Sequence, residues 1–243
     1  MSVTSSPLQI LLEDGPVLAV NKPAGLLTQG VPRGIPTLES QVKEYLKDRF
    51  KKPGNVYLGI PHRLDRPVSG VVLFSRNSKA AKRLAEQFQL RQVRKMYWGV
   101  VESAPDPPEG TLTDWLLKLP DEARAEVVPQ GTPSARECTL GYRTVARSSG
   151  LALLEIEPRT GRMHQIRVQL ASRGWFLVGD FLYGATRSLL SERSADFRAE
   201  PIALHARSLT FLHPIRYQPM TVTAPVPATW QSLDVLSSCT MGG

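Results

Sequence analysis

A single acidic residue stands between two arginines in the stretch HRLDRPVSG, residues 62–70. The acid is Asp65, and its neighbours are Arg63 and Arg66. Nearby guanidinium groups favour the charged form of a carboxyl group, so we expect Asp65 to be ionised at neutral pH. An ionised carboxylate is a poor general acid, but it can act as a nucleophile or as a base. The alternative is an ion pair that only holds a turn, and this stretch alone does not separate the two.

Several other chemistries find no support in the sequence. Four histidines, His62, His164, His205 and His213, are scattered without paired ligand spacing, so we expect each to be a hydrogen-bonded structural residue and predict no metal site. There is no phosphate-binding loop and no GxGxxG pattern. Ser69 lacks the glycine-flanked elbow of a serine nucleophile. The sequence therefore predicts neither a metal nor a cofactor.

The remaining candidates are a lone carboxylate, basic groups and an aromatic residue. They occur in four stretches, which are NKPAG, HRLDRPVSG, RKMYWGVVE and EPRTGRMHQIRVQL. A carboxylate can act at an electron-poor anomeric carbon, and an arginine can fix its direction through a bidentate pair. A tyrosine can stack on a flat base and can move a proton. These residue types suit cleavage of the C1′–N bond of a nucleoside.

The positive charge of the chain is concentrated in one segment. The whole chain carries 30 Lys and Arg against 22 Asp and Glu, a formal net charge of +8. Residues 43–95 hold 14 of these basic and 4 of these acidic residues, so this segment has a net charge of +10 and the rest has −2. A basic patch of this kind is typical of a polyanion partner such as nucleic acid. A solvated basic face is the alternative.

Composition limits the class of protein. The chain has 243 residues, 42% of them hydrophobic, which is enough for one sizeable core. No apolar run approaches the ~20 residues of a membrane span, and the first residues lack the pattern of a signal peptide. Only two cysteines, Cys138 and Cys239, are present, too few for a disulfide framework. We therefore expect a protein of a reducing compartment, the cytoplasm, that does not bind membranes.

Hydrophobic patterns predict the elements that position the four stretches. Residues 37–50 are expected to form a helix with Thr37 as its N-cap, and residues 55–60 a strand that delivers the Asp65 loop. Further helices are predicted over 78–90 and within 159–174. The other expected strands lie within 8–22, 70–75, 94–103, 137–146, 151–158, 204–214 and 220–227.

Strands outnumber helices in this prediction. The fold class is therefore expected to be α+β, with a mixed, largely antiparallel central sheet and few flanking helices. We expect a single catalytic domain over 1–243, with its core at about 8–225 and a C-terminal tail, 231–243, that is partly frayed.

The ordered stretches resemble a known family. HRLDRPVSG is similar to the HRLDxxTSG signature of the RluA-type pseudouridine synthases. The similarity continues in VNKPAG, KMYWGVVE, EPRTGRMHQIRVQLASRGWFLVGDFLYG and LHARSLTFLHP, which together span about residues 8–225. Pro67 and Val68 depart from the signature, and Val68 lacks the hydroxyl of the usual threonine. Many relatives carry an N-terminal S4-like domain, which we expect this chain to lack.

The resemblance implies roles for individual residues. Asp65 matches the catalytic aspartate, Tyr97 the tyrosine that packs on the target base and takes part in removing the C5 proton, and Arg167 the arginine that pairs with the aspartate. Arg63 matches an arginine that helps fill the space left by the flipped nucleotide, and Ile166 an apolar residue of the base pocket. The remaining predicted substrate-binding residues are Arg66 and Lys22.

The resemblance also implies the reaction. A uridine of structured RNA, either rRNA or tRNA, is flipped into the pocket, its C1′–N1 bond breaks, the base turns, and C5 bonds to C1′. Asp65 either adds to C1′ or removes a proton from C2′, and the sequence leaves both open. Two alternatives are an RNA-binding protein without catalysis and a hydrolase that releases uracil, although no second carboxylate in these stretches is suited to activate water. The partner is expected to be RNA, and the chain a monomer.

Overall fold

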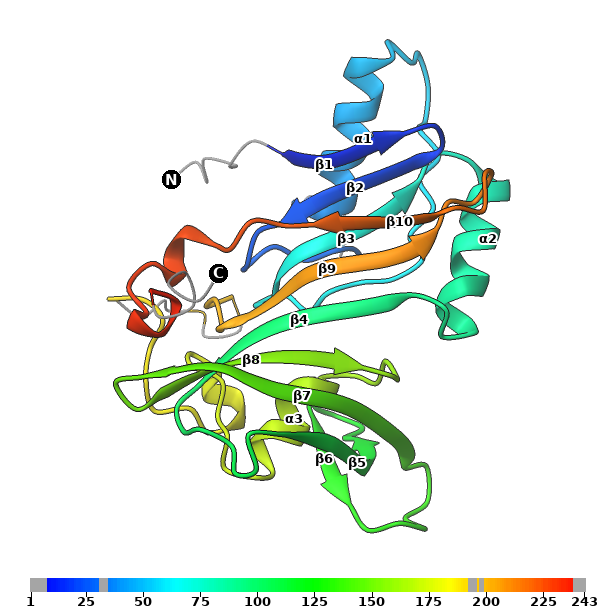
Figure 1. Cartoon of the computed structure of the whole chain (residues 1–243). Helices are drawn as coiled ribbons and strands as arrows, with labels where there is room; N and C mark the ends of the chain where they lie inside the picture. The colour runs from blue at the N-terminus through cyan, green and yellow to red at the C-terminus, as the bar shows by residue number, and fades with distance from the viewer. Residues whose placement is uncertain (1–7, 31–34, 192–195, 197–198, 238–243) are drawn as a thin grey trace.

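The computed structural model describes residues 8–30, 35–191, 196 and 199–237, and its strands dominate the molecule (Figure 1). The strands are β1 (Gln9–Asp14), β2 (Val17–Lys22), β3 (Ser69–Ser75), β4 (Arg94–Val101), β5 (Glu109–Lys118), β6 (Ala125–Val128), β7 (Arg136–Ser148), β8 (Leu151–Pro158), β9 (Leu204–Leu212) and β10 (Pro219–Thr223). The helices are α1 (Leu38–Arg49), α2 (Ser78–Gln89) and α3 (Gln165–Ala171), with 3₁₀ turns η1 (Phe181–Tyr183), η2 (Ala228–Trp230) and η3 (Asp234–Leu236).

All ten strands of the described residues belong to one sheet. Its order is β1-β2-β3-β9-β4-β8-β7-β5-β6, and β10 pairs with β9. Every pairing between these strands is antiparallel except that of β3 with β9, which is parallel. The predicted fold class, α+β with a mixed and largely antiparallel sheet, is confirmed.

The parallel contact between β3 and β9 is short and very close. It joins Ser69 to His205 and Gly70 to Ala206. Gly70 has φ +118, and a Cβ at this position would lie 2.3 Å from the carbonyl oxygen of Ala206. Only glycine fits both the backbone angle and this space, which explains the Ser-Gly pair that ends the HRLDRPVSG stretch.

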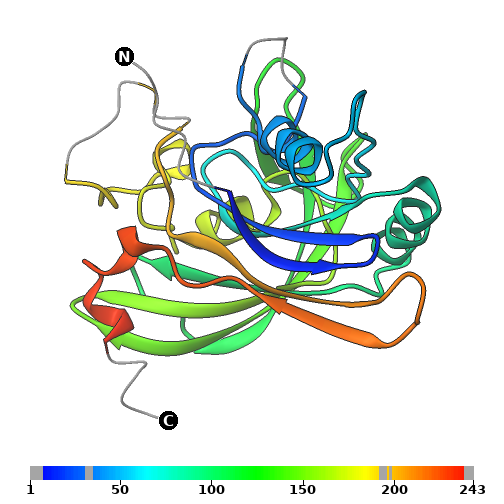
Figure 2. The same cartoon turned by 90° about the horizontal axis from the view of Figure 1, so that it is seen from above.

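The helices form where sequence patterns predict them. Thr37 caps α1, since its side chain accepts a hydrogen bond from the backbone N–H of Ser40. The apolar face of α1 buries Leu38, Val42 and Leu46. Helices α1 and α3 lie on the same side of the sheet (Figure 2), and α2 packs against β3 and β9.

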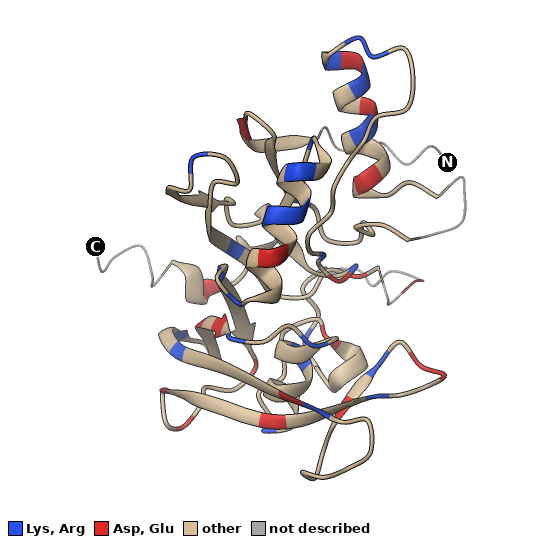
Figure 3. Ribbon diagram, turned by 90° about the vertical axis from the view of Figure 1, so that its right-hand side faces the viewer, with Lys and Arg blue, Asp and Glu red and all other residues tan. Residues whose placement is uncertain are grey.

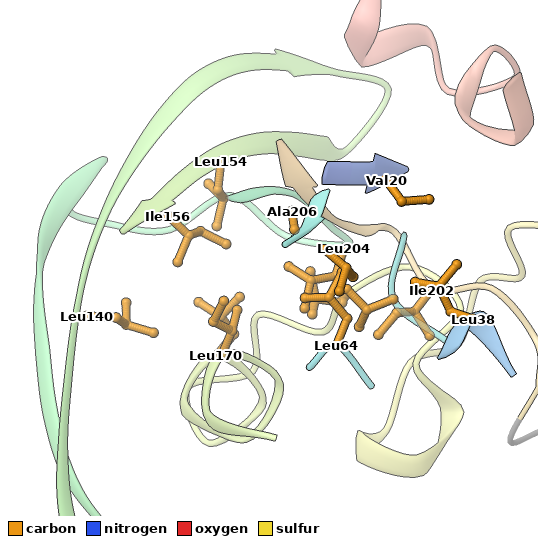
Figure 4. Packing of buried hydrophobic residues seen from close by; sticks show 14 of the residues in the cluster. Val20, Leu38, Leu64, Leu140, Leu154, Ile156, Leu170, Ile202, Leu204 and Ala206 are labelled. Atoms are coloured by element: carbon orange, nitrogen blue, oxygen red, sulfur yellow. The ribbon is translucent and has the colours of Figure 1, made fainter. Parts of the chain in front are cut away.

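The largest hydrophobic cluster joins both halves of the sheet. Leu38 of α1 and Val20 of β2 lie at one end, and Leu140 of β7 and Leu170 of α3 lie at the other, with Leu204 between them (Figure 4). All five side chains are buried. The loops that carry the candidate residues rest on this continuous core, so their backbones are held from below.

Two elements differ from the expectations. Residues 55–60 form no extended strand, because only Gly59 pairs with Ser75 as an isolated bridge. Strands β5 and β6 were not expected from the sequence. In the tail, Val235 is fully buried in a cluster with Trp230, and residues 238–243 lie outside the described part of the chain, so the partial fraying of 231–243 stays a prediction.

Candidate active site

The loop that carries Asp65 is fixed through its backbone and through the ring of His62. The Nε2 atom of His62 accepts the backbone N–H of Leu73 on β3 at 2.9 Å, and its ring stacks on Phe88 at 4.6 Å between centroids. Thr28 Oγ1 donates to the carbonyl of Leu64 at 2.9 Å. The carbonyl of Asp65 accepts the N–H of Val68 at 3.1 Å, which closes a turn. The acid therefore projects from a rigid loop.

Lys22 stabilises this loop from inside the protein. Its ammonium donates to the carbonyls of Pro23, Leu26 and Arg66 at 2.9, 2.7 and 3.1 Å. The side chain is fully buried, and burial lowers the pKa of Lys22 to about 7. These three carbonyl contacts of a buried ammonium favour a supporting role for Lys22, and substrate binding by Lys22 stays a prediction. The NKPAG stretch supports the loop of Asp65.

Five of the residues predicted from the sequence line one cavity, which we call the basic cavity. Its volume is about 580 Å³, and these residues are Arg63, Asp65, Tyr97, Ile166 and Arg167. They come from the loop before β3, from β4 and from α3. Chain topology thus brings together three stretches that are far apart in the sequence.

The lining of the basic cavity is strongly positive. Asp65 is the only carboxylate among its lining residues. The six basic lining residues are Arg63, Arg91, Lys95, Arg159, Arg162 and Arg167. Further Lys and Arg lie on α2, whose C-terminal end reaches the cavity through Phe88 and Gln89 (Figure 3). Such a lining favours an anionic ligand.

Arg167 has a second acidic partner that the sequence did not reveal. Its Nε and Nη2 atoms donate to the two oxygens of Asp180, both at 2.7 Å, and both side chains are buried. Its Nη1 atom lies 3.8 Å from Oδ2 of Asp65. The expected pairing with Asp65 is present as this longer contact, while the bidentate pair is made with Asp180.

His164 also faces Asp65. It precedes α3 with left-handed backbone angles, φ 52 and ψ 22, and its Nε2 atom lies 3.8 Å from Oδ2 of Asp65. Its Nδ1 atom lies 2.9 Å from the hydroxyl of Tyr183. Burial lowers the pKa of His164. In the sequence, His164 belongs to the HQIR motif and Tyr183 to the GDFLYG motif. Only the fold shows that these two motifs are in contact.

Tyr97 lies half-buried on β4, in the wall of the basic cavity. Burial and, to a smaller extent, the charge of Asp65 raise the pKa of its hydroxyl above the ordinary value. The phenol is therefore neutral at physiological pH. A neutral ring of this kind can stack on a base and can exchange its proton with a stronger base.

Arg66 points away from the basic cavity. Its Nε atom donates to the carbonyl of Gly25 at 3.0 Å, and its Nη1 atom lies 2.8 Å from Asp196. It lines a second cavity of about 650 Å³, which we call the balanced cavity. Val68, where the signature has threonine, is buried in the main core. A methyl group suits that apolar position, so the departure leaves the Asp65 loop intact.

Within the described ranges, no group of three or more His, Cys, Asp or Glu side chains could hold a metal ion. Each of the four histidines makes a hydrogen bond: His205 bonds Ser69 at 2.9 Å, and His213 accepts the backbone N–H of Arg216 at 3.1 Å. His164 was also expected to be structural, but it faces Asp65 in the basic cavity. None of the described helices is long and apolar enough to cross a membrane.

Comparison with known proteins gives consistent results. A family described as RNA pseudouridylate synthase matches residues 16–172. An uncharacterised RNA pseudouridine synthase of Zymomonas mobilis is 33% identical over 93% of this chain and 96% of its own. The ribosomal large subunit pseudouridine synthase D of Xylella fastidiosa is 37% identical over 91% of this chain and 66% of its own. The tRNA pseudouridine synthase C of Vibrio cholerae is 30% identical over 93% of this chain and 94% of its own.

Solved structures agree on the fold. Human RNA pseudouridylate synthase domain containing 4 superposes with a TM-score of 0.75 at 23% identity, covering 96% of this chain and 93% of its own.

The matched family, the extent of the sequence identity and the RluA-type motifs around Asp65 lead to one conclusion. The chain belongs to the RNA pseudouridylate synthase family and is an RNA pseudouridine synthase, an isomerase.

Proposed function

We propose that this enzyme converts specific uridines of structured RNA to pseudouridine, with Asp65 acting at the ribose of a uridine that is flipped into the basic cavity. The observation that carries the proposal is the convergence of Asp65, Tyr97 and Arg167 on one cavity with six basic lining residues. The target RNA is rRNA or tRNA, since the named relatives include a ribosomal large subunit synthase and a tRNA synthase.

The chemistry assigns one task to each residue. Asp65 adds to C1′ or removes a proton from C2′, and the C1′–N1 bond breaks. The freed uracil turns, and C5 bonds to C1′. Tyr97 packs against the base and takes part in transfer of the C5 proton, while Arg167 orients Asp65. The product has the composition of the substrate, so atoms balance without a co-reactant.

The remaining residues hold the nucleotide. Ile166 supplies an apolar wall, and the exposed Arg63 fills the space that the flipped nucleotide leaves. Lys95 is half-buried, and its ammonium donates to the carbonyl of Thr160 at 3.2 Å. Burial, together with the charge of Arg91, lowers the pKa of Lys95. A phosphate of the RNA would supply the missing counter-charge, so we assign Lys95 to backbone binding.

We further propose that the enzyme acts as a monomer in the cytoplasm, where a buried free thiol such as that of Cys138 stays reduced.

The test is to map pseudouridine in cellular RNA with and without the protein, and then to incubate the purified enzyme with the RNA so identified. We expect conversion of uridine without change of mass and without free uracil. Release of uracil would indicate a hydrolase, and binding without either product would indicate an RNA-binding protein. Asp65→Asn is the control, since it should bind the RNA but form no product.

A further inference from the structure

Asp180 restricts the guanidinium of Arg167 to one orientation. Two of the three nitrogen atoms of the guanidinium, Nε and Nη2, donate to Asp180 in a bidentate pair. Only 2% of the Asp180 side chain is exposed. The third nitrogen, Nη1, is the one that faces Oδ2 of Asp65 at 3.8 Å. The ring of Tyr183 lies under the guanidinium carbon, 5.0 Å from its centroid. Arg167 therefore has little freedom to turn away from Asp65.

Tyr183 restricts His164 in a similar way, because its hydroxyl has a single proton. The hydroxyl oxygen accepts the backbone N–H of Ala125 at 3.0 Å. The hydroxyl oxygen lies 2.9 Å from Nδ1 of His164, its only other partner at hydrogen-bond distance among the described residues, so its one proton is best placed to be donated to that nitrogen. A neutral imidazole that accepts at Nδ1 carries its proton on Nε2. That N–H faces Oδ2 of Asp65 at 3.8 Å.

We propose that Asp180 and Tyr183 are positioning residues, which aim one N–H from Arg167 and one from His164 at the same oxygen of Asp65. The inference rests on the proposed function of Asp65. Among the described residues no hydrogen bond is made to either oxygen of the Asp65 side chain, but both 3.8 Å contacts end on Oδ2. This arrangement leaves Oδ1 as the oxygen that acts at the ribose, with the two N–H groups directed at Oδ2. We expect both contacts to shorten from 3.8 Å when substrate binds, as catalytic hydrogen bonds often do.

The neutral state of His164 is part of this arrangement. Its charged neighbours are Asp65 and Asp180, which favour the imidazolium, and Arg63 and Arg167, which oppose it. Burial is the largest influence and lowers the pKa of His164. With one proton on the ring, the identity of the tautomer depends on the hydroxyl of Tyr183.

The first experiment uses Tyr183→Phe, with Tyr142→Phe as the matched control. Both rings are buried, 8% and 6% exposed, and the hydroxyl of Tyr142 likewise has a backbone partner, since it donates to the carbonyl of Pro107. Tyr183→Phe removes the hydroxyl that keeps the proton of His164 on Nε2, so either ring nitrogen can carry it. We therefore expect kcat to fall about tenfold with KM unchanged. Because burial lowers the pKa of His164, little recovery is expected between pH 8 and 6, but below pH 6 part of this loss should be recovered as imidazolium, which carries a proton on both nitrogens, becomes populated. Tyr142→Phe should lower the melting temperature at most, with kcat retained.

A double-mutant cycle separates positioning from a merely structural role. In a His164→Gln background, Tyr183→Phe should cause no further loss of kcat, because its effect passes through His164. Additive losses in the cycle, or a loss in Tyr183→Phe that does not change with pH, would overturn the assignment of Tyr183.

The second experiment uses Asp180→Asn, with Asp114→Asn as the matched control. Asp114 forms a similar bidentate pair with Arg173, at 3.0 and 3.1 Å, outside both cavities. We expect Asp180→Asn to lower kcat at least tenfold at unchanged RNA affinity, and Asp114→Asn to leave kcat of the folded enzyme unchanged. Equal effects on kcat from the two variants would overturn the assignment of Asp180.

Asp65→Asn is measured in the same series. If it retained turnover, the proposed function of Asp65 would fail on its own, whatever the other variants show. If it is inactive while Asp180→Asn and Tyr183→Phe turn over at the wild-type rate, only the positioning inference fails.

Discussion

The basic cavity and the balanced cavity meet at Asp65 but use their charges differently. Both are lined by Arg63, Asp65, His164 and Arg167. The basic cavity adds four more basic residues and no acid, whereas the balanced cavity has four arginines and four carboxylates in all. In the balanced cavity Arg167 pairs with Asp180 and Arg66 with Asp196.

This difference separates ligand binding from scaffolding. A nearby carboxylate neutralises the charge of an arginine, so little positive potential remains in the balanced cavity to attract an anionic ligand. Among the residues that the structure describes, Lys95 of the basic cavity has only a carbonyl partner, so its charge stays available. Asp65 therefore faces two cavities. The charge of the basic cavity favours an anionic ligand, and an ion pair of the balanced cavity holds Arg167, which orients Asp65.

The change that both cavities share should have the largest effect. Asp65→Asn keeps the shape of the side chain but removes its charge and basicity, so we expect kcat to fall by at least about 1,000-fold. The melting temperature should stay near that of the wild type, and RNA affinity should persist. Turnover, melting and RNA binding are measured on one preparation. A variant that melts far lower yet still converts uridine at the wild-type rate would make Asp65 a structural residue.

A change on the balanced side should act through geometry. Arg167→Lys keeps one positive charge but cannot form the bidentate pair with Asp180. We expect kcat to fall about 10- to 100-fold, since roughly 1.4–2.8 kcal/mol of transition-state stabilisation is lost, while the Kd for RNA stays within about twofold. Single-turnover kinetics and a binding titration separate the two quantities. Unchanged turnover would show that Arg167 does not orient Asp65.

A change on the basic side should act through affinity. Lys95→Gln removes one charge that we assign to a phosphate, so the slope of log affinity against log salt should become shallower by about 0.7–0.9. KM should rise several-fold while kcat is nearly kept. Binding is titrated at four or more salt concentrations. An unchanged slope would leave Lys95 as a support for the Thr160 carbonyl only.

The smallest effect is expected for Arg124→Gln in the balanced cavity. Arg124 lies over the ring of Tyr183, 5.8 Å from its centroid, and Asp121 and Glu122 line the same wall. The charges around Arg124 already balance, so we expect no phosphate contact there. The slope of log affinity against log salt should then change by less than about 0.3, which is well below the change of about 0.7–0.9 for one phosphate contact. A slope change as large as that of Lys95→Gln would show that RNA also enters the balanced cavity.

Sequence patterns predicted the parts of this structure that depend on local order. The N-cap at Thr37, the buried strand β3 and the residues around Asp65 follow from periodicity, capping and motifs. Lys22 was predicted to bind substrate because a lysine in a motif suggests a ligand contact, whereas its three carbonyl partners are apparent only in the folded chain. The missed strands β5 and β6 carry mixed, weakly alternating side chains, and half of β5 is exposed.

The partners of Asp65 mark a further limit of sequence reasoning. Asp180 and Tyr183 stand 13 and 19 residues after Arg167 and His164, respectively, and no periodicity links such separations. Their contacts exist because η1 folds back over the start of α3. Motifs therefore identified which residues matter, and the tertiary fold determined which of them meet.

The close contact of β3 with β9 also has a consequence for the synthesis of the protein. Ser69 and His205 are 136 residues apart, and β9 separates β3 from β4 in the sheet. During translation the Asp65 loop leaves the ribosome long before the strand that must lie beside it, and β4, which bears Tyr97, joins β3 in the sheet through β9. Such distant pairings form late in folding. We therefore expect the isomerase to be inactive on RNA until β9 has been synthesised and has paired.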